Sequence, residues 1–446
     1  MDPVEAQIAE WRAYVAKAPA VGDRDVDELE AHLRDQIAEL DAMDLTADEA
    51  FLVAVKRMGD LDSLSREFAR EHSGRLWKQL VLRDGDDAEP VRRSGGWLEV
   101  LVPAVGAAVA VQVARLAAGF PDQEPGWLLR NAGLLVLPFL AGYLARRRRL
   151  DTRGWLVTAA PFVLAALVVN LYPFRPGGAT EVLVGLHLPV VLWLAVAHPY
   201  MGGTLRSHER RMDFVRFTGE WIIYYVLIAL GGSVLLLLTG AILDPIGVDV
   251  ELVAEWVVPS GAAGAVIVSA WLVESKQHVV ENMAPVLTLL FTPLFAVMLS
   301  VAAVAYLVSG AAFDRELLGV FDALLVVVLG LVLYATSARD PSRPAGLMDG
   351  VRLLTVASAL VLDVLVLGSM VARIGDLGFT PNRAAALGLN LVLLVNLGWT
   401  AWLSLRFLTG RVPFHRVERW QTAYLPVFAG WAAAVVVVLP PVFGFE

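Results

Sequence analysis

Cysteine is absent from this chain of 446 residues, and only four of its residues are lysine. The lack of cysteine excludes disulfide bonds, thiolate metal sites and cysteine nucleophiles. Charge is also scarce, because Asp, Glu, Lys and Arg make up only 18% of the residues, against about a quarter in ordinary globular domains. This composition argues against a set of soluble domains.

Catalytic signatures are missing as well. The chain contains no H-E-x-x-H, no G-x-S-x-G, no Walker A motif and no dinucleotide fingerprint. We therefore predict no catalytic residues, no metal site and no cofactor, and we do not expect an enzyme. Any active transport would need an ion gradient or a separate motor subunit.

Apolar residues dominate the chain instead, at 57% of the total. From Trp97 onward, apolar runs of about 20 residues recur, which is the length that crosses a hydrocarbon core. We predict an all-α fold, with a small cytoplasmic helical bundle followed by a polytopic membrane domain of about eleven spans. The predicted spans are residues 97–119, 127–145, 155–172, 182–200, 220–241, 256–273, 285–308, 318–337, 352–372, 384–407 and 424–443.

Acidic residues gather at the front of the chain. Residues 1–80 hold 18 Asp or Glu and 10 Lys or Arg, a balance of -8 out of the net charge of -9. Such a segment is not suited to nucleic acid or to anionic lipid. Because the first apolar run begins near residue 97, we expect no signal peptide before it.

The front segment predicts four short amphipathic helices in residues 1–72. The third is expected to start at a T-x-x-E capping box, Thr46 to Glu49, and to end at Gly59. Residues 1–82 would form a bundle ending in an interfacial segment, 83–96 a polar linker, and 97–446 the membrane domain. The expected core positions of the first, second and fourth helices are Val4, Ile8, Trp11 and Val15, then Val26, Leu29, Leu33, Ile37 and Leu40, and lastly Leu61, Leu64 and Phe68.

Part of this segment resembles a known bacterial domain. The runs "DELEAHLRDQIAEL" and "TADEAFLVAVKRMGD" are similar to the HAAS-type, or permease-prefix, domain. The resemblance implies a signalling or assembly module whose partner is a PadR-type regulator or a membrane assembly factor, and it brings no catalytic residues. The matching residues are Glu28, Leu29, His32, Leu33, Asp48, Glu49, Ala50, Phe51, Ala54, Val55, Arg57, Gly59 and Asp60.

Basic residues in the short loops predict the orientation. If residues 1–96 are cytoplasmic, 17 Lys or Arg lie in the inside loops and 5 in the outside loops. The positive-inside rule then places the N-terminus in the cytoplasm and the C-terminus outside. We expect a bacterial cytoplasmic membrane protein whose main partner is the lipid bilayer, with no nucleic acid bound.

The later spans resemble a second family. "LYATSARDP" and "ARIGDLGFTPNRAAALGLNLVLLVNL" are similar to a bacterial membrane family described only as domain of unknown function 4153. Its most recognisable piece covers residues 373–383, within a similarity of about residues 205–440. The resemblance implies a membrane topology and no established activity.

Asp363 is the clearest candidate for a functional residue inside the membrane, near the centre of the ninth predicted span. An Asp at mid-span costs about 2.5–3.5 kcal/mol on insertion scales. It is either a proton or cation site facing a cavity, or a structural group that accepts bonds from Ser, Thr or Asn. Asp322 lies nearer the outer surface and is expected to be solvated.

Three further polar residues fall within spans. Asn390 and Asn396 could bond Asp363 or a solute, although polar residues commonly hold neighbouring spans together. His187 could relay protons, or it could bond a backbone carbonyl.

The turn "IGDLGFTPNR" brings charged residues to the predicted outer face. Arg373, Asp376 and Arg383 could contact an anion or a headgroup. The alternative is a rigid turn fixed by Pro381, with Thr380 as a cap.

Two functions remain open from the sequence. The favoured one is a non-enzymatic sensor or regulatory protein whose front domain binds a cytoplasmic partner. The alternative is a secondary transporter or permease with a midplane site around Asp363. Substrate, signal and oligomeric state do not follow from the sequence.

Overall fold

The computed structural model describes residues 3–15, 23–41, 47–58, 97–119, 126–243, 250–275, 283–310, 313–341 and 343–446. These described residues are helical and contain no strand, so the predicted all-α fold is confirmed for them. The predicted fourth front helix, the capping residue Thr46 and the linker at 83–96 lie outside the described residues.

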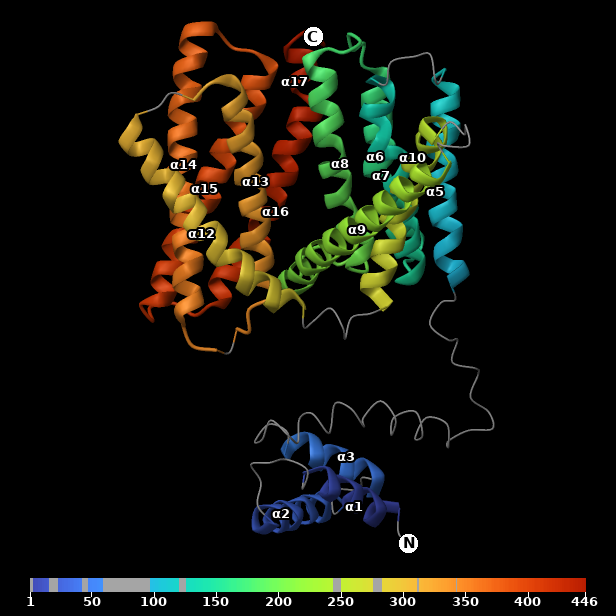
Figure 1. The fold of residues 1–446 in the computed structure, drawn as a ribbon, viewed down its shortest axis with the longest axis vertical. Helices are drawn as coiled ribbons and strands as arrows, with labels where there is room; N and C mark the ends of the chain where they lie inside the picture. Colours follow the sequence, from blue (N-terminus) through green and yellow to red (C-terminus); the bar gives the residue numbers. More distant parts are fainter. Residues whose placement is uncertain are drawn as a thin grey trace. The chain divides into compact units, whose positions relative to one another are not determined.

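The chain divides into two compact units, Met1–Ser94 and Gly95–Glu446. In the front unit, α1 (Pro3–Val15), α2 (Asp23–Asp41) and α3 (Ala47–Met58) are the described helices (Figure 1). Their apolar stripes meet in a shared core, as helical spacing requires of amphipathic helices. The buried members are Val4, Ile8, Trp11, Val26, Leu33, Leu40, Ala50, Phe51, Ala54 and Val55.

Ion pairs join α1 to α2 along the rim of this core. Arg12 of α1 binds both Asp27 and Glu30 of α2. Arg34 of α2 lies 2.6 Å from Glu5 of α1 and 3.0 Å from Glu30. The guanidinium groups of Arg34 and Arg12 hold the pKa values of Glu5 and Glu30 below their usual range.

The second unit contains the long apolar helices. Eleven helices of the described residues are long and apolar enough to cross a membrane, which confirms the predicted number of spans. We therefore describe the chain as a multi-pass membrane protein. The helices are α5 (Trp97–Ala117), α6 (Gly126–Arg147), α7 (Thr152–Leu171), α8 (Ala179–Tyr200), α9 (His208–Leu243), α10 (Val250–Ser275), α12 (Met283–Ser309), α13 (Arg315–Ser337), α14 (Leu347–Leu377), α15 (Pro381–Leu408), α16 (His415–Val437) and the short α17 (Leu439–Val442).

Two helix boundaries differ from the prediction. α9 begins at His208 rather than near 220, because the polar segment before the span is itself helical and buries Phe214 and Phe217 in the core. α16 begins at His415 and ends at Val437 rather than near 443. The chain then restarts as α17, where consecutive prolines remove backbone donors and interrupt the helix.

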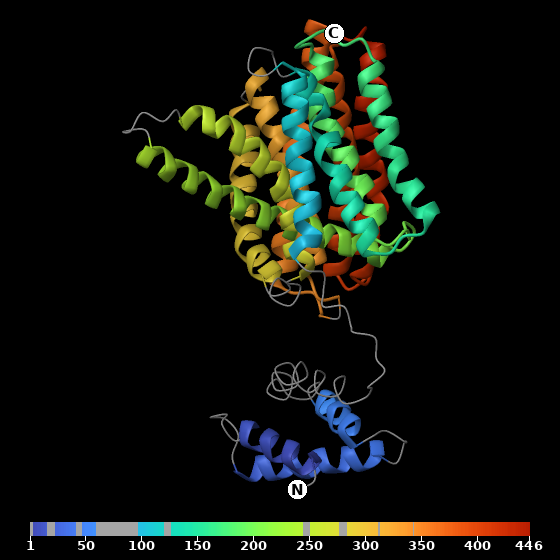
Figure 2. The same ribbon diagram turned by 90° about the vertical axis from the view of Figure 1, so that its right-hand side faces the viewer.

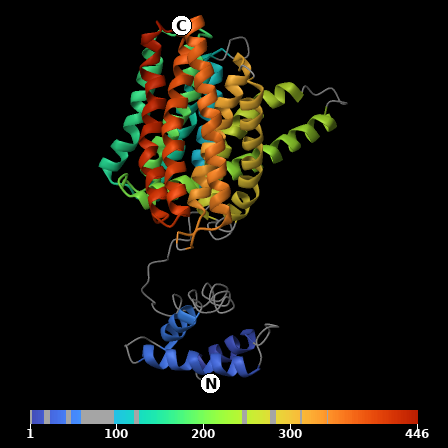
Figure 3. The ribbon, with the colours of Figure 1, turned by 90° about the vertical axis from the view of Figure 1, so that its left-hand side faces the viewer.

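The membrane unit has two halves with separate cores. One core draws mainly on α5 to α10, the other on α12 to α15 (Figure 1). α16 packs against both α8 and α15, and α9 contacts α13, so these helices join the halves. Figures 2 and 3 show that the end of α9 and the start of α10 lean away from the other helices.

Glycine permits two of the closest helix contacts. A Cβ atom added at Gly219 of α9 would lie 2.3 Å from the ring of Tyr334 in α13. One added at Gly388 of α15 would lie 2.0 Å from the ring of Trp431 in α16. Small residues let membrane helices approach closely, and both positions accept no larger residue without movement.

Candidate functional site

Asp363 lies at the middle of α14, and its side chain is wholly buried in the α12 to α15 core. Neither of its carboxyl oxygens has a hydrogen-bond partner among the described residues. The predicted structural role, in which Asp363 accepts bonds from Ser, Thr or Asn, is therefore not what this arrangement provides. A buried carboxylate without donors is strongly destabilising unless it is neutral or accompanied by a cation.

Asn390 of α15 lies close to a second carboxyl group. Its Nδ2 atom donates to Oδ1 of Asp322 in α13 at 2.7 Å and to the Ala386 carbonyl at 2.9 Å. The Oδ1 atom of Asn390 is buried and lacks a partner among the described residues. Asp322, which we expected to be solvated, is half-buried and bonded across two helices.

Asp322, Asp363 and Asn390 form what we call the acidic cluster. The carboxyl groups of Asp322 and Asp363 interact electrostatically, which places them in one neighbourhood. The cluster is wrapped by apolar side chains of the same core, including Leu325, Leu362 and Leu393. In so apolar an environment the two carboxyl groups cannot both carry an uncompensated negative charge, so at least one holds a proton or a cation.

The depth of the acidic cluster follows from helix geometry. At a rise of 1.5 Å per residue, Asp322 lies about 10 Å from the start of α13 and Asn390 about 14 Å from the start of α15. Asp363 lies about 21 Å from the end of α14, measured from the same end of the bundle. The three groups therefore form a descending series that reaches the middle of the membrane span.

Polar residues also lie on one face of α14 between Asp363 and the start of the helix at Leu347. Asp349, Arg352, Thr355 and Asp363 recur at helical spacing on this face. Thr355 is buried and contacts the Thr292 carbonyl of α12 at 3.4 Å. One α14 face thus carries polar groups at the helix start and again at Asp363. Between Thr355 and Asp363 the one polar side chain of α14 is Ser358, which bonds Ser300 of α12 at 2.9 Å.

A buried ion pair closes the starting end of α14. Arg339 lies 2.8 Å from Asp349 Oδ1, and Arg352 lies 3.3 Å from the same oxygen. The Arg339 guanidinium also stacks on the rings of Phe407 and Phe414, at 4.7 Å and 4.2 Å from their centroids. Cation–π contacts of this kind fix the side chain in place.

A small cavity of about 30 Å³ lies beside this ion pair. Its lining includes Asp349, Arg352, Thr355 and, from α15, Thr400. A single water molecule occupies about 30 Å³ in the liquid and needs two or more polar partners. The cavity meets both conditions, so a water can extend the polar face of α14 inward.

Asn396 is not part of the acidic cluster. Its Nδ2 atom donates to Gln421 of α16 at 3.3 Å, and Gln421 donates to Thr400 at 2.7 Å. All three side chains are buried between α15 and α16. The role of Asn396 is the interhelical bond that we considered from the sequence.

His187 is likewise away from the acidic cluster. Its Nδ1 atom lies 2.8 Å from the Leu183 carbonyl, which accepts a hydrogen bond from it within α8. The structure thus gives His187 the backbone bond that was the alternative to a proton relay.

The turn between α14 and α15 contains the three charged residues that were predicted at the outer face. Arg383 donates to the carbonyls of Leu377 at 2.9 Å and Gly378 at 2.6 Å, which caps the end of α14. Thr380 is the N-cap of α15, followed by Pro381. Arg373 is half-buried and Asp376 is exposed. These contacts agree with the rigid turn, which was one of the two interpretations that the sequence left open for the three charged residues.

The sequence identified Asp363 and Asn390 but missed the partner that joins them into a site. Asp322 looked superficial because its span was expected to begin at residue 318. The helix in fact begins at Arg315, capped by Asp314, whose carboxylate accepts a bond from the Leu317 amide at 2.8 Å. Asp314 is the sequence signal that could have identified Asp322 as part of the site. An N-cap at Asp314 starts the helix at Arg315, and Asp322 then lies two turns inside it.

Among the described residues, no group of three or more His, Cys, Asp or Glu is placed to hold a metal ion. No family model, no curated protein and no solved structure matches the chain. The two family resemblances therefore stay predictions from the sequence, and the function must be argued from the site.

Proposed function

We propose that the membrane unit is a proton-coupled secondary transporter in which Asp363 binds and releases the proton. The observation that carries this proposal is a wholly buried carboxyl group with no hydrogen-bond partner among the described residues, within electrostatic reach of a second carboxyl group. Intramembrane carboxyl groups of this kind are typical of proton relays in transporters. A structural carboxyl group would instead be expected to use its oxygens as acceptors.

A proton suits the acidic cluster better than a metal cation does. Hard cations such as Ca²⁺ take about 6–8 oxygen ligands, and Mg²⁺ requires a nearly ideal octahedron. The acidic cluster offers two carboxyl groups and one amide oxygen from its side chains. A proton needs only one oxygen, and it removes the charge that makes burial unfavourable.

The polar face of α14 is the route by which the proton would reach the cytoplasmic side. Under the orientation predicted from the loop arginines, the Arg339–Asp349 pair lies at the cytoplasmic end and the α14–α15 turn at the outer end. Between Thr355 and Asp363 the one polar side chain of α14 is Ser358, which is buried and bonded to Ser300 of α12 at 2.9 Å. In the proposed cycle this buried segment opens only in the inward-facing state, as alternating access requires.

The front unit supports the sensor or regulatory function that the sequence favoured. It has a separate core and an acidic composition, so it suits a protein partner rather than the anionic membrane surface. We propose that it lies in the cytoplasm and binds a partner that reports or regulates transport. Deleting residues 1–80 would then abolish the response of the partner and leave the membrane helices inserted.

A pH jump on reconstituted vesicles tests the transport proposal without knowledge of the solute. We expect the wild type to give a transient charge displacement when the outside pH falls, because Asp363 takes up a proton within the membrane field. Asp363→Asn should abolish it. Asp376→Asn is the matched control, since Asp376 is exposed on the same helix. An undiminished signal from Asp363→Asn would refute the proposal.

A further inference from the structure

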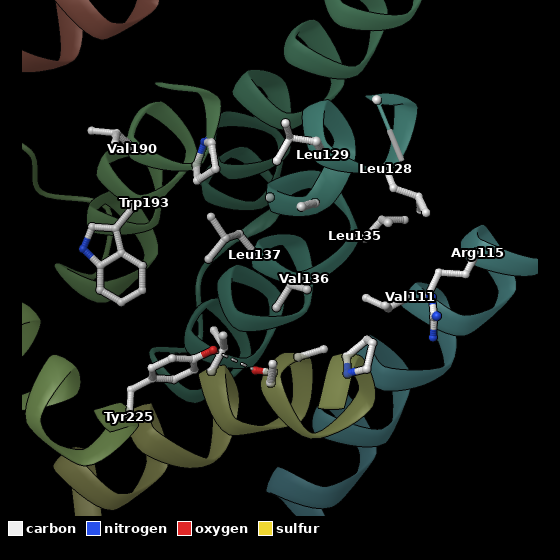
Figure 4. Close-up of a pocket in the computed structure, with 18 of the residues that line it drawn as sticks. Val111, Arg115, Leu128, Leu129, Leu135, Val136, Leu137, Val190, Trp193 and Tyr225 are labelled. Atoms are coloured by element: carbon white, nitrogen blue, oxygen red, sulfur yellow. Dashed lines mark hydrogen bonds between the residues drawn. The ribbon is translucent and has the colours of Figure 1, made fainter. Parts of the chain in front are cut away.

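An apolar cavity lies in the other half of the membrane unit. It has a volume of about 950 Å³ and lies between α5, α6, α8, α9 and α10. Ligand sites in proteins typically measure about 300–1,000 Å³. Figure 4 shows Val136 and Leu137 of α6, Trp193 of α8 and Arg115 of α5 around it. We call this cavity the α6 groove, because α6 supplies more of its lining than any other helix.

The length of the α6 groove matches one leaflet of a bilayer. Its lining residues on α6 run from Gly126 to Leu137, which corresponds to about 16 Å along the helix. Half of a hydrocarbon core of about 30 Å is about 15 Å. Because Gly126 is the first residue of α6, the α6 groove begins at the membrane boundary and ends near the midplane.

The lining of the α6 groove suits a hydrocarbon chain. It consists almost entirely of apolar side chains, with Arg115 at one end. Acyl chains form the hydrocarbon core of the bilayer at this depth.

Aromatic residues line the deep end of the α6 groove, and the nitrogen atoms of the two tryptophans are bonded within the protein. Trp193 and Trp221 lie 4.3 Å apart between ring centroids, and Tyr225 follows at 5.1 Å from Trp221. The indole nitrogen of Trp193 donates to Thr218 at 3.1 Å, and that of Trp221 donates to the Val266 carbonyl at 2.9 Å. Since these N–H groups are satisfied within the protein, the ring faces offer the α6 groove an apolar surface.

The Arg115 side chain lies at the end of the α6 groove that is nearer the membrane boundary. Arg115 lines the α6 groove two residues before the end of α5, at the same membrane boundary as Gly126. Its guanidinium group is held by Gln112 Oε1 at 3.2 Å and by the Glu255 carbonyl. A guanidinium has five N–H donors in a fixed fork that matches phosphate. These contacts orient Arg115 before any ligand arrives.

We propose that the α6 groove is a lipid site, which takes an acyl chain of one glycerophospholipid along α6 and its phosphate on Arg115. Three features of the α6 groove agree on this occupant: an apolar lining, the length of one leaflet, and a positive charge at the headgroup level. A polar solute would leave its hydrogen bonds unmade against such a lining. The site is independent of the acidic cluster, which belongs to the other core.

Native mass spectrometry of the full chain with added phosphatidylglycerol tests the site by counting bound lipid. We expect the wild type to retain one phospholipid after detergent washing. Ala262→Trp fills the α6 groove from α10, where Ala262 is exposed to it, and should remove that lipid. Ala160→Trp is the matched control, because Ala160 is equally lipid-facing on α7 and lies outside the α6 groove. Equal lipid retention by the two variants would overturn the proposal.

The headgroup contact has its own pair of variants. Arg115→Gln should weaken phosphatidylglycerol binding about tenfold, the effect of losing one charged hydrogen bond. Arg315→Gln, at an exposed arginine of the same membrane boundary on α13, should leave it unchanged. If both variants bind as the wild type does, the phosphate does not lie on Arg115 and this part of the proposal fails.

A spectroscopic measurement keeps the test decisive if Ala262→Trp does not fold. In vesicles of phosphatidylcholine and phosphatidylglycerol with brominated chains, the groove tryptophans of the wild type should be quenched. Replacing Trp193 by Phe should then remove a larger share of the quenchable fluorescence than replacing Trp431 of α16, which is half-buried as Trp193 is and does not line the α6 groove. A smaller share for Trp193 would show that no acyl chain enters the α6 groove.

Discussion

The two halves of the membrane unit treat their polar groups in opposite ways. In the α5 to α10 half, two buried carboxylates near helix ends are paired, Glu181 with Arg130 and Glu274 with Arg148. Its centre is an apolar groove. In the α12 to α15 half, the ends are also closed by an ion pair, but the centre holds the acidic cluster. Since charge at the centre of a membrane is unfavourable, only the second half has a centre that a stabilising role does not explain.

The largest predicted effect tests whether the ends of the halves are equivalent. Arg130→Leu should destabilise the protein by about 3–5 kcal/mol, because it leaves the buried Glu181 carboxylate without its ion-pair partner. Arg339→Leu should cost less than Arg130→Leu, because Arg352 still lies 3.3 Å from Asp349. Arg343→Leu should cost less than about 1 kcal/mol, because its pair with Asp340 is exposed. Thermal unfolding in detergent measures all three. Equal effects of Arg339→Leu and Arg343→Leu would contradict the burial argument.

The next prediction concerns the centre of the second half. Asp363→Leu should stabilise the unliganded protein by about 1–3 kcal/mol, because it removes a buried carboxyl group that has no partner among the described residues. Asn396→Leu should destabilise by a similar amount, since it breaks the bond to Gln421. The same unfolding assay compares them. A loss of stability in Asp363→Leu would identify Asp363 as a structural group and weaken the transport proposal.

A third prediction addresses the joint between the halves. Gly219→Ala should destabilise by about 1–3 kcal/mol, because the added methyl group collides with Tyr334 across the α9–α13 contact. Gly368→Ala is the control, as no atom lies within 4 Å of the added Cβ. The two variants are distinguished by their midpoints of thermal unfolding. If they unfold at the same temperature, the halves are not packed as closely as described.

The smallest predicted effect separates the front unit from both halves. The pKa values of Glu5 and Glu30 are lowered in the folded state, so their ion pairs stabilise the front unit above the unfolded pKa of about 4.5. That contribution is lost as the pH falls through the folded pKa values. Hydrogen exchange of α1 and α2 in the full chain, corrected for intrinsic rates, should show this loss. Arg34→Gln should reduce the pH dependence, and an unchanged profile would contradict the prediction.

Much of the architecture was predictable from particular residues. Apolar runs of membrane-spanning length gave the eleven helices, because insertion depends on composition along each segment rather than on neighbours. Boundaries were less predictable. His208 and His415 begin helices in segments whose polar composition indicated loops, since burial of Phe214 and Val417 depends on distant helices.

The candidate site was predictable only in part. Asp363 stood out because an acidic residue at mid-span is unfavourable whatever surrounds it. Its neighbours did not, because Asn390 and Asn396 are equally polar and occupy the same helix. In the structure, Asn390 bonds Asp322 and Asn396 bonds Gln421. The two partners differ because Asn390 faces α13 and Asn396 faces α16.

The sequence by itself determined that this protein is a multi-helix membrane body with an acidic segment at its front and a carboxyl group at mid-span. These properties follow from composition and helical period, which act locally. Only the tertiary structure decided that Asp322 bonds Asn390 within electrostatic reach of Asp363, and that five helices leave an apolar groove ending at Arg115. Pairing between helices depends on the fit of side chains far apart in the chain, and no local pattern encodes that fit.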